Sequence, residues 1–507
     1  MVKKSSAPVK GKASAKKVLK KPASKKATPA QSEPAEPRLV ENMATFDLKE
    51  FLHEMQTVLG CAPCADKVVL ATACSGLGVP AAVLRSIMGD AAKVVEITAS
   101  EISETSAHAL LQNCPKGHQP LQLLRNVVDA ASSGKSFCYI ANKVTPMNEL
   151  FGSEGTDIYV AGYPCNDNSS MNTSRFDPQK DATTTPFAAV LPAVVHVLDK
   201  LAPKAFLLEN VPGLLKKRSG QSPSSAEPVM SWVEDKLKSK LGNRYSWFSL
   251  MLPSDPLPTR RDRIFTIGLR KDIACHPGQL TGLQSDINKL VSAASAMPVH
   301  HVSGFLHVDP APNDAQQTGC EPGGDADDGD EDMVATGYVD AQQGNYAVCF
   351  EKAVHRAVQA GRVSKDSPLL LPHISRMSAS MPHETAWMRA QIDVYQLIIA
   401  HMKEGLHPDV ADSLHAVADV GQSAERGHVH LHGDLPCLTT SSRLFDYQSR
   451  RFLLPAELAA SMGMGRVDFR GLTLSQSSAI LGKSMATTTL AILFLPLLKC
   501  LQMCQEA

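Results

Sequence analysis

The stretch KVVLATACSGLGVPAAVLRSIMG, residues 67–89, indicates the fold more clearly than any other part of the chain. Its first half is a short β-branched run that ends in a glycine turn, and its second half has the apolar spacing of a helix. Pro80 lies in the first turn of that helix, where proline is tolerated, and Gly89 follows its last residue. A strand, a tight turn and a helix in this order predict the start of a βαβ unit.

Further buried strands follow at intervals along the chain. They are VVEITASE (94–101), DIYVAGYP (157–164) and AFLLENV (205–211), and helical stretches such as FAAVLPAVVHVLDKL (187–201) separate them. Near-continuous apolar strands between helices indicate a parallel sheet that is covered on both faces. The neighbouring runs YSWFSLML and DRIFTIGLR are close enough to form an antiparallel pair at one edge. The sequence therefore predicts an α/β fold with a mostly parallel sheet.

Changes of composition divide the chain into four parts. Residues 1–43 form a basic tail and a Pro-rich linker, and residues 44–271 form the α/β domain, which opens on the helical spacing of FDLKEFLHEMQTVLG. We expect a second, irregular domain at 272–435, with an acidic, solvated loop at 320–332 and an amphipathic helix in HETAWMRAQIDVYQLIIAHMKEG. The remaining part, 436–507, returns to helical patterns that we expect to pack on the first domain.

Composition indicates a soluble intracellular protein. The chain has 507 residues, of which 43% are apolar, enough for two or three domains with sizeable cores. It contains no apolar run of 18 residues and begins without the apolar segment of a secretory signal, so we expect no membrane partner. The twelve cysteines are scattered, and the close pair Cys61 and Cys64 lacks a second pair at zinc-site spacing. We therefore expect reduced thiols and no metal.

The formal net charge of +0 conceals an uneven distribution of charge. Residues 1–30 hold ten lysines and no acid, which leaves 41 basic against 51 acidic residues in the rest of the chain. Lysine pairs among alanine, serine and proline cannot build a core, so we expect this tail to be disordered. The composition leaves three uses open: binding of nucleic acid, import into the nucleus, or solubility. We predict a nuclear protein that binds nucleic acid.

Four polar features at predicted strand ends have both a functional and a structural interpretation. Gly-x-Gly after the first strand allows a cofactor to approach the backbone, but it also occurs in plain tight turns. Cys165 follows a proline at a strand end. It is either a nucleophile or a buried structural thiol. Glu209 is either a buried acid of raised pKa or a helix cap, and Arg261 and Arg263 either bind anions or lie on a solvated strand face.

The order of these features along the chain resembles that of the cytosine C5 methyltransferase family. Gly-x-Gly, Pro-Cys, Glu-Asn-Val and Arg-x-Arg occur in the family's own order. Near the C-terminus, LPCLTTSSRLFDYQSRRFLLPAELAASMGM is similar to the family's Thr-Thr stretch and to the motif that follows it, and ILGKSMATTTL is similar to its last motif. The resemblance covers roughly residues 67–270 and 436–495. It implies a Rossmann-like methyltransferase fold with a smaller target-recognition domain.

The resemblance also implies a chemistry and its residues. Cys165 would attack C6 of a DNA cytosine flipped out of the duplex, Glu209 would hold N3, and Arg261 and Arg263 would hold the base. The methyl group would come from S-adenosylmethionine and would be transferred to C5. The cofactor-binding residues implied by the motifs are Ser75, Gly76, Leu77, Gly78, Glu101, Asn126, Pro164 and Ser484.

Departures from the family's motifs keep alternatives open. Asn166, Asp167 and Asn168 follow Cys165 where the family has Gln-x-x, and Lys483 replaces the asparagine of the last motif. A carboxylate close to Cys165 would raise the pKa of its thiol. One alternative is thus a catalytically impaired, chromatin-binding paralogue; another is methylation of cytosine in transfer RNA. A nicotinamide-dependent oxidoreductase would explain the glycines but not the Pro-Cys and Glu-Asn-Val motifs. The sequence does not indicate the recognised DNA context or the oligomeric state.

Overall fold

The computed structural model describes residues 46–60, 66–89, 91–146, 155–169, 185–216, 228–273, 278–306, 346–365 and 384–503. The predicted basic tail and linker at 1–43 and the acidic loop at 320–332 lie outside the described residues. Their predicted states therefore stay predictions.

The described residues contain one large sheet of nine strands, in the order β5-β4-β3-β2-β1-β6-β7-β9-β8. In chain order the strands are β1 (Val68–Ala73), β2 (Val94–Ser100), β3 (Leu123–Leu124), β4 (Lys135–Cys138), β5 (Lys143–Pro146), β6 (Ile158–Gly162), β7 (Ala205–Asn210), β8 (Tyr245–Leu252) and β9 (Arg263–Arg270). The pairs from β3 through β2, β1 and β6 to β7 are parallel, and the β7–β9 and β9–β8 pairs are antiparallel. This confirms the predicted mostly parallel sheet and its antiparallel edge.

A second antiparallel edge, formed by β4 and β5, was not predicted. Both strands have four residues, and their sequences KSFC and KVTP contain exposed lysines in place of an apolar run. Short edge strands that carry lysine resist pairing with other chains, but for the same reason they give little sequence signal.

The central strands are buried on both faces, which explains their continuous apolar sequences. Along β1, Val68 and Leu70 belong to the apolar cluster on one face, while Val69 and Ala71 belong to the cluster on the other. This is the period of two expected of a strand, with both sets of side chains facing a core.

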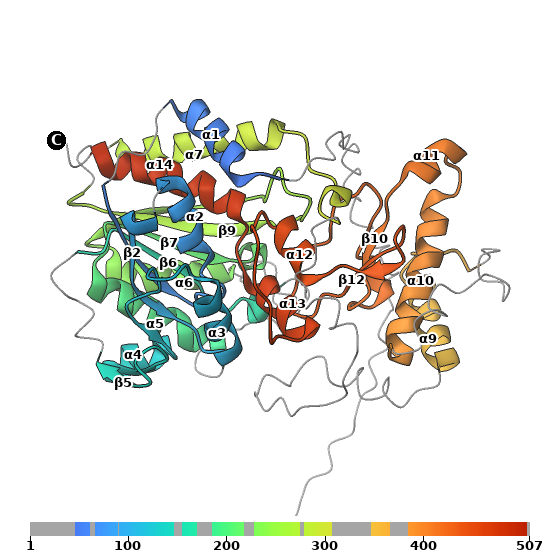
Figure 1. Ribbon diagram of the computed structural model, residues 1–507, viewed down its shortest axis with the longest axis horizontal. Coiled ribbons are helices and arrows are strands. Elements are labelled where there is room, and N and C mark those ends of the chain that lie inside the picture. Colours follow the sequence, from blue (N-terminus) through green and yellow to red (C-terminus); the bar gives the residue numbers. More distant parts are fainter. Residues whose placement is uncertain are drawn as a thin grey trace, which may run out of the picture. The chain divides into compact units, whose positions relative to one another are not determined.

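Helices cover both faces of the sheet (Figure 1). On one face, a first group of helices shares an apolar core with Val68 and Leu70 of β1. On the opposite face, a second group shares a core with Val69 and Ala71. The first group is α1 (Leu48–Leu59), α2 (Val79–Met88), α7 (Gln279–Ala296) and α14 (Thr487–Met503). The second is α4 (Val127–Ser133), α5 (Pro186–Leu201) and α6 (Val229–Leu241), while α3 (Glu104–Asn113) contributes to a smaller cluster beside β2 and β3.

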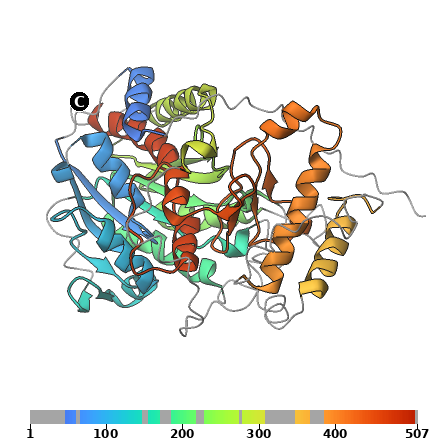
Figure 2. The ribbon, with the colours of Figure 1, turned by 45° about the vertical axis from the view of Figure 1, so that its right-hand side comes forward.

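A smaller sheet forms a second structural region. Its order is β11-β10-β12-β13, and all its pairs are antiparallel. The strands are β10 (Val417–Asp419), β11 (Val429–His430), β12 (Leu444–Asp446) and β13 (Arg451–Phe452). Two helices pack side by side against it, α9 (Tyr346–Gln359) and α10 (Ala386–Lys403), as Figure 2 shows, and α11 (Pro408–Ser413) follows α10. The observed α10 corresponds to the amphipathic helix expected in this region.

The predicted boundary at residue 272 differs from the observed packing. Helix α7 lies within the segment expected to form the second domain, yet it packs against α1 and α14 on the large sheet. Its buried side chains, among them Leu283, Ile287 and Leu290, join the same core cluster as Val68. The spacing of these residues predicts an amphipathic helix, but only tertiary contacts decide which surface that helix covers.

The C-terminal segment packs on the large sheet, as expected. It contains α12 (Pro455–Ser461), α13 (Leu474–Lys483) and α14, and α14 contacts α1, α2 and α7. Among the described residues, only Leu474–Gln502 is long and apolar enough to cross a membrane by length and composition, and 94% of its apolar window is buried inside the protein. A core helix has the same properties, and α14 is such a helix.

Gly268 in β9 offers a test of how tightly the large sheet is packed. A Cβ atom at this position would lie 2.1 Å from Cε1 of Phe206, a fully buried ring of β7. We expect Gly268→Ala to lower the free energy of unfolding by about 1–3 kcal/mol or more, because a packed core cannot absorb the added methyl group. Chemical denaturation measures the change.

Gly282→Ala is the matched control for Gly268→Ala. Gly282 is exposed within α7, and a Cβ atom there would meet no atom within 4 Å. We expect this substitution to stabilise the protein by about 0.5–1 kcal/mol, the usual difference between alanine and glycine inside a helix. Equal effects of the two substitutions would contradict the packing described for Gly268.

Candidate active site

Cys165 lies just beyond the carboxyl end of β6, a central strand between β1 and β7. The backbone leaves the strand through Tyr163 and Pro164 and turns into a short 3-10 helix, η3 (Asn166–Asn168). The amide of Asn168 donates to the carbonyl oxygen of Cys165 at 3.0 Å, which closes this turn. Cys165 keeps part of its surface exposed, although its thiol is largely screened from water. Ligands of open α/β sheets bind at this end of the strands.

Asn210, the last residue of β7, holds the loop that carries Cys165. Its side-chain amide donates to the carbonyl oxygens of Tyr163 at 3.1 Å and of Pro164 at 3.4 Å. Its Oδ1 accepts from the amide of Val211 at 2.9 Å. Asn210 is 1% exposed, so these bonds form away from solvent. The asparagine of the Glu-Asn-Val motif therefore positions the backbone immediately before Cys165.

Glu209 forms an ion pair with Arg263 at the same end of the sheet. Oε1 of Glu209 lies 2.9 Å from Nε of Arg263, and the two side chains are only 9% and 11% exposed. Gly162 of β6 leaves room for this pair, because a Cβ atom there would lie 3.2 Å from Oε2 of Glu209. Glu209 does not cap a helix, so the structural alternative for this residue is wrong. A buried carboxylate beside a cation can also form a hydrogen bond with a bound nucleobase.

Cys437 completes the surroundings of Arg263 and is not among the residues that the motifs predicted. Both Nη atoms of Arg263 lie 3.8 Å from Sγ of Cys437. Cys437 belongs to the stretch LPCLTT, which was quoted only for its threonines. A signal was therefore present, but nothing in one sequence shows that residue 437 meets residue 263.

The pKa of the Cys165 thiol is raised above its ordinary value. Burial contributes most, the charge of Glu209 also raises the pKa, and the charges of Arg263 and Arg261 lower it without cancelling the increase. The resting side chain is therefore a protonated thiol. Any change that weakens the influence of Glu209 or strengthens that of the arginines would favour the thiolate.

Alkylation of Cys165 should therefore depend on pH in a defined way. We expect its peptide to react with iodoacetamide more slowly at neutral pH than the peptide of Cys349, a partly exposed thiol in α9. Because only the thiolate reacts, the rate at Cys165 should continue to rise above pH 9, the ordinary pKa of a thiol. Mass spectrometry of the labelled peptides measures both rates. A plateau below neutral pH would contradict the raised pKa.

Asp167 bonds to the start of α5. Its Oδ2 accepts from the amide of Phe187 at 3.2 Å, in the first turn of that helix. A carboxylate at a helix N-terminus is stabilised by the free amides and by the helix dipole. The larger influences on the pKa of the Cys165 thiol are burial, Glu209 and the two arginines, and an effect of Asp167 on this pKa stays a prediction.

The glycine turn after β1 lies beside the start of the next helix. Gly76 and Gly78 have φ angles of +53° and +71°, and these left-handed conformations favour glycine. The amide of Gly76 donates to Oε2 of Glu101 at 2.9 Å, and the amide of Ser103 donates to Oε1 at 3.0 Å. Glu101 thus holds the turn and the start of α3 together, and Leu77 lies between the two glycines. These are the residues that the resemblance implied for a cofactor, and that role stays a prediction.

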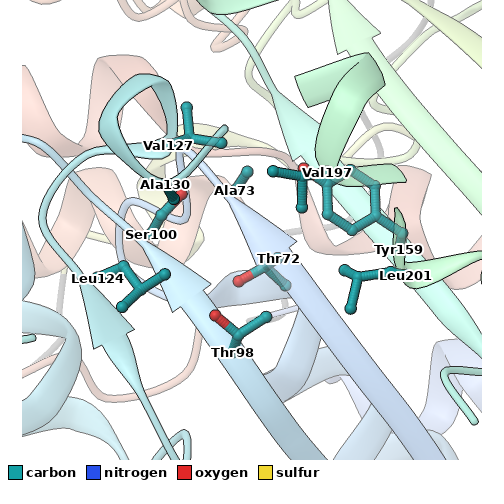
Figure 3. Close-up of a pocket in the computed structure, with 10 residues that line it drawn as sticks. All are labelled: Thr72, Ala73, Thr98, Ser100, Leu124, Val127, Ala130, Tyr159, Val197 and Leu201. Carbon is teal, nitrogen blue, oxygen red and sulfur yellow. The ribbon is translucent and has the colours of Figure 1, made fainter. Parts of the chain in front are cut away.

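Buried hydrogen bonds between side chains hold the residues that lead into this turn. The side chains of Thr72 and Ser75 lie 2.6 Å apart, and Thr72 donates to Oε1 of Glu96 at 2.7 Å. Burial raises the pKa of Glu96 to about 7. Thr72 also lines a cavity of about 20 Å³ with Ser100 and Tyr159, shown in Figure 3. This cavity has room for about one water molecule and is too small for a cofactor.

Asn126 lies at the start of α4, and Ser484 lies beside the glycine turn. Oδ1 of Asn126 accepts from the amide of Val128 at 2.8 Å and so caps α4, and a bond to a cofactor from this oxygen stays a prediction. Ser484 lies at the break between α13 and α14, and its Oγ would be 4.0 Å from a Cβ atom at Gly76. The C-terminal motif therefore meets the first motif, although about 400 residues separate them in the sequence.

Arg261 is directed toward the backbone of two other segments. It is 3% exposed, its Nη1 donates to the carbonyl oxygen of Leu438 and its Nη2 to that of Gly482, both at 3.0 Å. Burial, followed by the charge of Arg263, lowers its pKa to about 10. In this structure Arg261 joins the Thr-Thr stretch to α13. Contact with a substrate, which the resemblance implied for both arginines, stays a prediction.

The mostly parallel sheet, with Cys165, Glu209 and Arg263 at one end of its strands and a glycine turn after β1, is the arrangement that the resemblance to methyltransferases implied. Residues 140–300 match the C-5 cytosine-specific DNA methylase family. A segment of 119 residues is 32% identical to the type II methyltransferase M.BsuFI of Bacillus subtilis. The match covers 23% of this chain and 25% of that protein, so it spans about a quarter of the relative's length.

Two methyltransferases are among the solved structures whose backbones were matched to this one. The Entamoeba histolytica methyltransferase EhMeth has 13% identity and a TM-score of 0.40, with 85% of this chain and 98% of that chain covered. The S. pombe Dnmt2 methyltransferase has 10% identity and a TM-score of 0.42, with the same coverage of the two chains.

Proposed function

We propose that this protein transfers a methyl group from S-adenosylmethionine to C5 of cytosine in DNA. The observation that carries the proposal is the meeting of Cys165 with the Glu209–Arg263 pair at the carboxyl ends of β6 and β7. The match of residues 140–300 to the DNA methylase family supports the same reaction. An oxidoreductase would leave both the cysteine and the buried acid without a role.

The glycine turn and its neighbours fit an S-adenosylmethionine molecule. Gly76 and Gly78 have no side chain where a cofactor would approach, and the carboxylate of Glu101 retains free lone pairs for the ribose hydroxyls. Asn126, Pro164 and Ser484 complete the proposed site. When bound, the cofactor supplies an electrophilic methyl group.

The proposed reaction uses each side chain in a distinct step. The Cys165 thiolate adds to C6 of a cytosine that has left the base stack, since C6 is inaccessible within a duplex. Glu209 bonds to N3 and stabilises the charge that develops in the ring. The electron pair released toward C5 takes the methyl group as the bond from that methyl group to the sulfur of S-adenosylmethionine breaks, and S-adenosylhomocysteine is left. A base such as water then takes the C5 proton, and the electron pair of that C–H bond re-forms the C5–C6 double bond and expels the Cys165 thiolate. Arg263 keeps the Glu209 carboxylate in place.

The basic tail would supply affinity for the DNA backbone. Its lysines balance the negative charge of the rest of the chain, and lysines bind phosphate by releasing counterions. We propose that the tail strengthens binding to the duplex and directs the protein to the nucleus. The salt dependence of DNA binding by the full chain, compared with a chain that lacks residues 1–43, tests the first role.

Covalent trapping tests the proposed function. DNA that contains 5-fluorocytosine cannot lose a proton from C5, so with S-adenosylmethionine present the enzyme should remain attached to it. We expect an adduct with the wild type and with the control Cys349→Ala, and none with Cys165→Ala. Absence of a wild-type adduct, where a known cytosine-5 methyltransferase forms one, would contradict the proposal. A parallel RNA oligonucleotide distinguishes the two nucleic acids, because trapping on RNA alone would reject DNA as the substrate.

A further inference from the structure

A second cavity, of about 360 Å³, lies beside α2 and is separate from Cys165 and Glu209. Residues of α1, α2, α3 and β2 line it, and it shares only Leu77 and Gly78 with the proposed cofactor site. Its volume falls within the range of about 300–1,000 Å³ that is typical of small-molecule sites. Much of the wall is small or aliphatic, with Ala81, Ala82 and Leu110 among its residues.

Glu96 brings a buried carboxylate to this cavity. It is 3% exposed, in the middle of β2, and its Oε1 accepts the hydroxyl of Thr72 at 2.7 Å. Its Oε2 has no hydrogen-bond partner among the described residues. Glutamate is rarely buried unless it is paired or functional. Support of the glycine turn through Thr72 uses only Oε1 of Glu96, so the free Oε2 calls for another explanation.

Arg85 brings a cation to the same cavity. Its Nη2 donates to the carbonyl oxygen of His118 at 2.6 Å, while its Nε has no partner within the described chain. Arg85 and Glu96 form no ion pair with each other, although both line the cavity. Lys49, in the first turn of α1, adds a second cation. The cavity is therefore lined by one carboxylate, of Glu96, and by two cationic side chains, of Arg85 and Lys49.

We propose that this cavity binds a small α-amino acid with an aliphatic side chain. Its ammonium group would donate to Oε2 of Glu96, and its carboxylate would face Arg85 and Lys49. Arginine suits a carboxylate because its planar N–H groups match the two oxygens. The aliphatic side chain would lie against Leu77, Ala81 and Leu110. This binding site goes beyond methyl transfer and uses none of the catalytic side chains proposed above.

Calorimetry on the full chain with L-leucine as the probe tests this site. Two matched analogues each lack one charge: 4-methylpentanoate has no ammonium group, and 3-methylbutylamine has no carboxylate. We expect L-leucine to bind at least tenfold more tightly than either analogue. Absence of L-leucine binding at millimolar concentration, or equal binding of an analogue, would overturn the proposal.

Variants locate the binding in the cavity. Glu96→Gln and Arg85→Gln should each weaken L-leucine binding at least tenfold, while Glu234→Gln on α6, outside the cavity, should leave it unchanged. Ala82→Leu keeps both charges and places a larger side chain at an exposed position of the wall, so it should also abolish binding. If Glu96→Gln does not fold, Ala82→Leu decides the question. Unchanged binding in Ala82→Leu would overturn the assignment.

Discussion

Replacement of Glu209 by glutamine is expected to lower the rate of methyl transfer by roughly 10²- to 10⁴-fold, the usual contribution of a positioned acid or base. Glutamine has the same shape but carries no charge and cannot donate a proton as a carboxylic acid can. It also breaks the ion pair with Arg263, which lies 2.9 Å from the carboxylate. Steady-state transfer of a labelled methyl group to DNA measures the effect.

The control for Glu209→Gln is Glu234→Gln. Glu234 is half-exposed on α6, where it pairs with Lys238, and a surface pair of this kind contributes little to stability. This variant should retain wild-type activity. Binding of S-adenosylhomocysteine to Glu209→Gln should also persist, because Glu209 does not line the glycine turn. A Glu209→Gln enzyme within threefold of the wild-type rate would show that Glu209 is not the acid.

Replacement of Arg261 by methionine is expected to lower the free energy of unfolding by about 3–5 kcal/mol, the cost of breaking a buried charged interaction. Methionine preserves most of the apolar volume but leaves the carbonyl oxygens of Leu438 and Gly482 without their donor. Gly482 lies so close to the Thr-Thr stretch that a Cβ atom there would be 2.3 Å from the carbonyl carbon of Thr439. Chemical denaturation measures the loss.

The neighbouring Arg260 is the control for Arg261. Its side chain is 70% exposed and forms an ion pair with Asp434, so Arg260→Met should cost about 1 kcal/mol or less. Arg263→Met provides a second comparison, since it leaves the buried Glu209 carboxylate without its cation and should reduce both activity and stability. If Arg261→Met and Arg260→Met unfold at the same denaturant concentration, Arg261 does not join the two segments.

The sequence predicts the large sheet well because its central strands are buried on both faces. Strands such as β1 and β7 appear as continuous apolar runs, and glycines at the ends of α2 mark its limits. The edge strands β4 and β5 are missed because they are short and half-exposed. The site of α7 is misjudged for a different reason: its apolar stripe predicts a helix but not the partner on which the helix packs.

The candidate site shows the same division. Cys165, Glu209 and Arg263 are predicted from their motifs, and the structure brings them to one end of the sheet. Cys437 is missed because its contact with Arg263 depends on the path of the chain through the second region. The bond from Asp167 to the start of α5 is missed because closeness in sequence to Cys165 does not fix where a side chain points.

By itself, the sequence determined the α/β class, the order of the motifs and the types of side chain available for chemistry, since these follow from local spacing and composition. Tertiary structure alone decided how the two arginines differ. Arg261 and Arg263 are two residues apart on one extended segment, yet one joins backbone carbonyls and the other faces the buried acid. The partners of a buried charge come from distant segments, and only the folded chain brings those segments together.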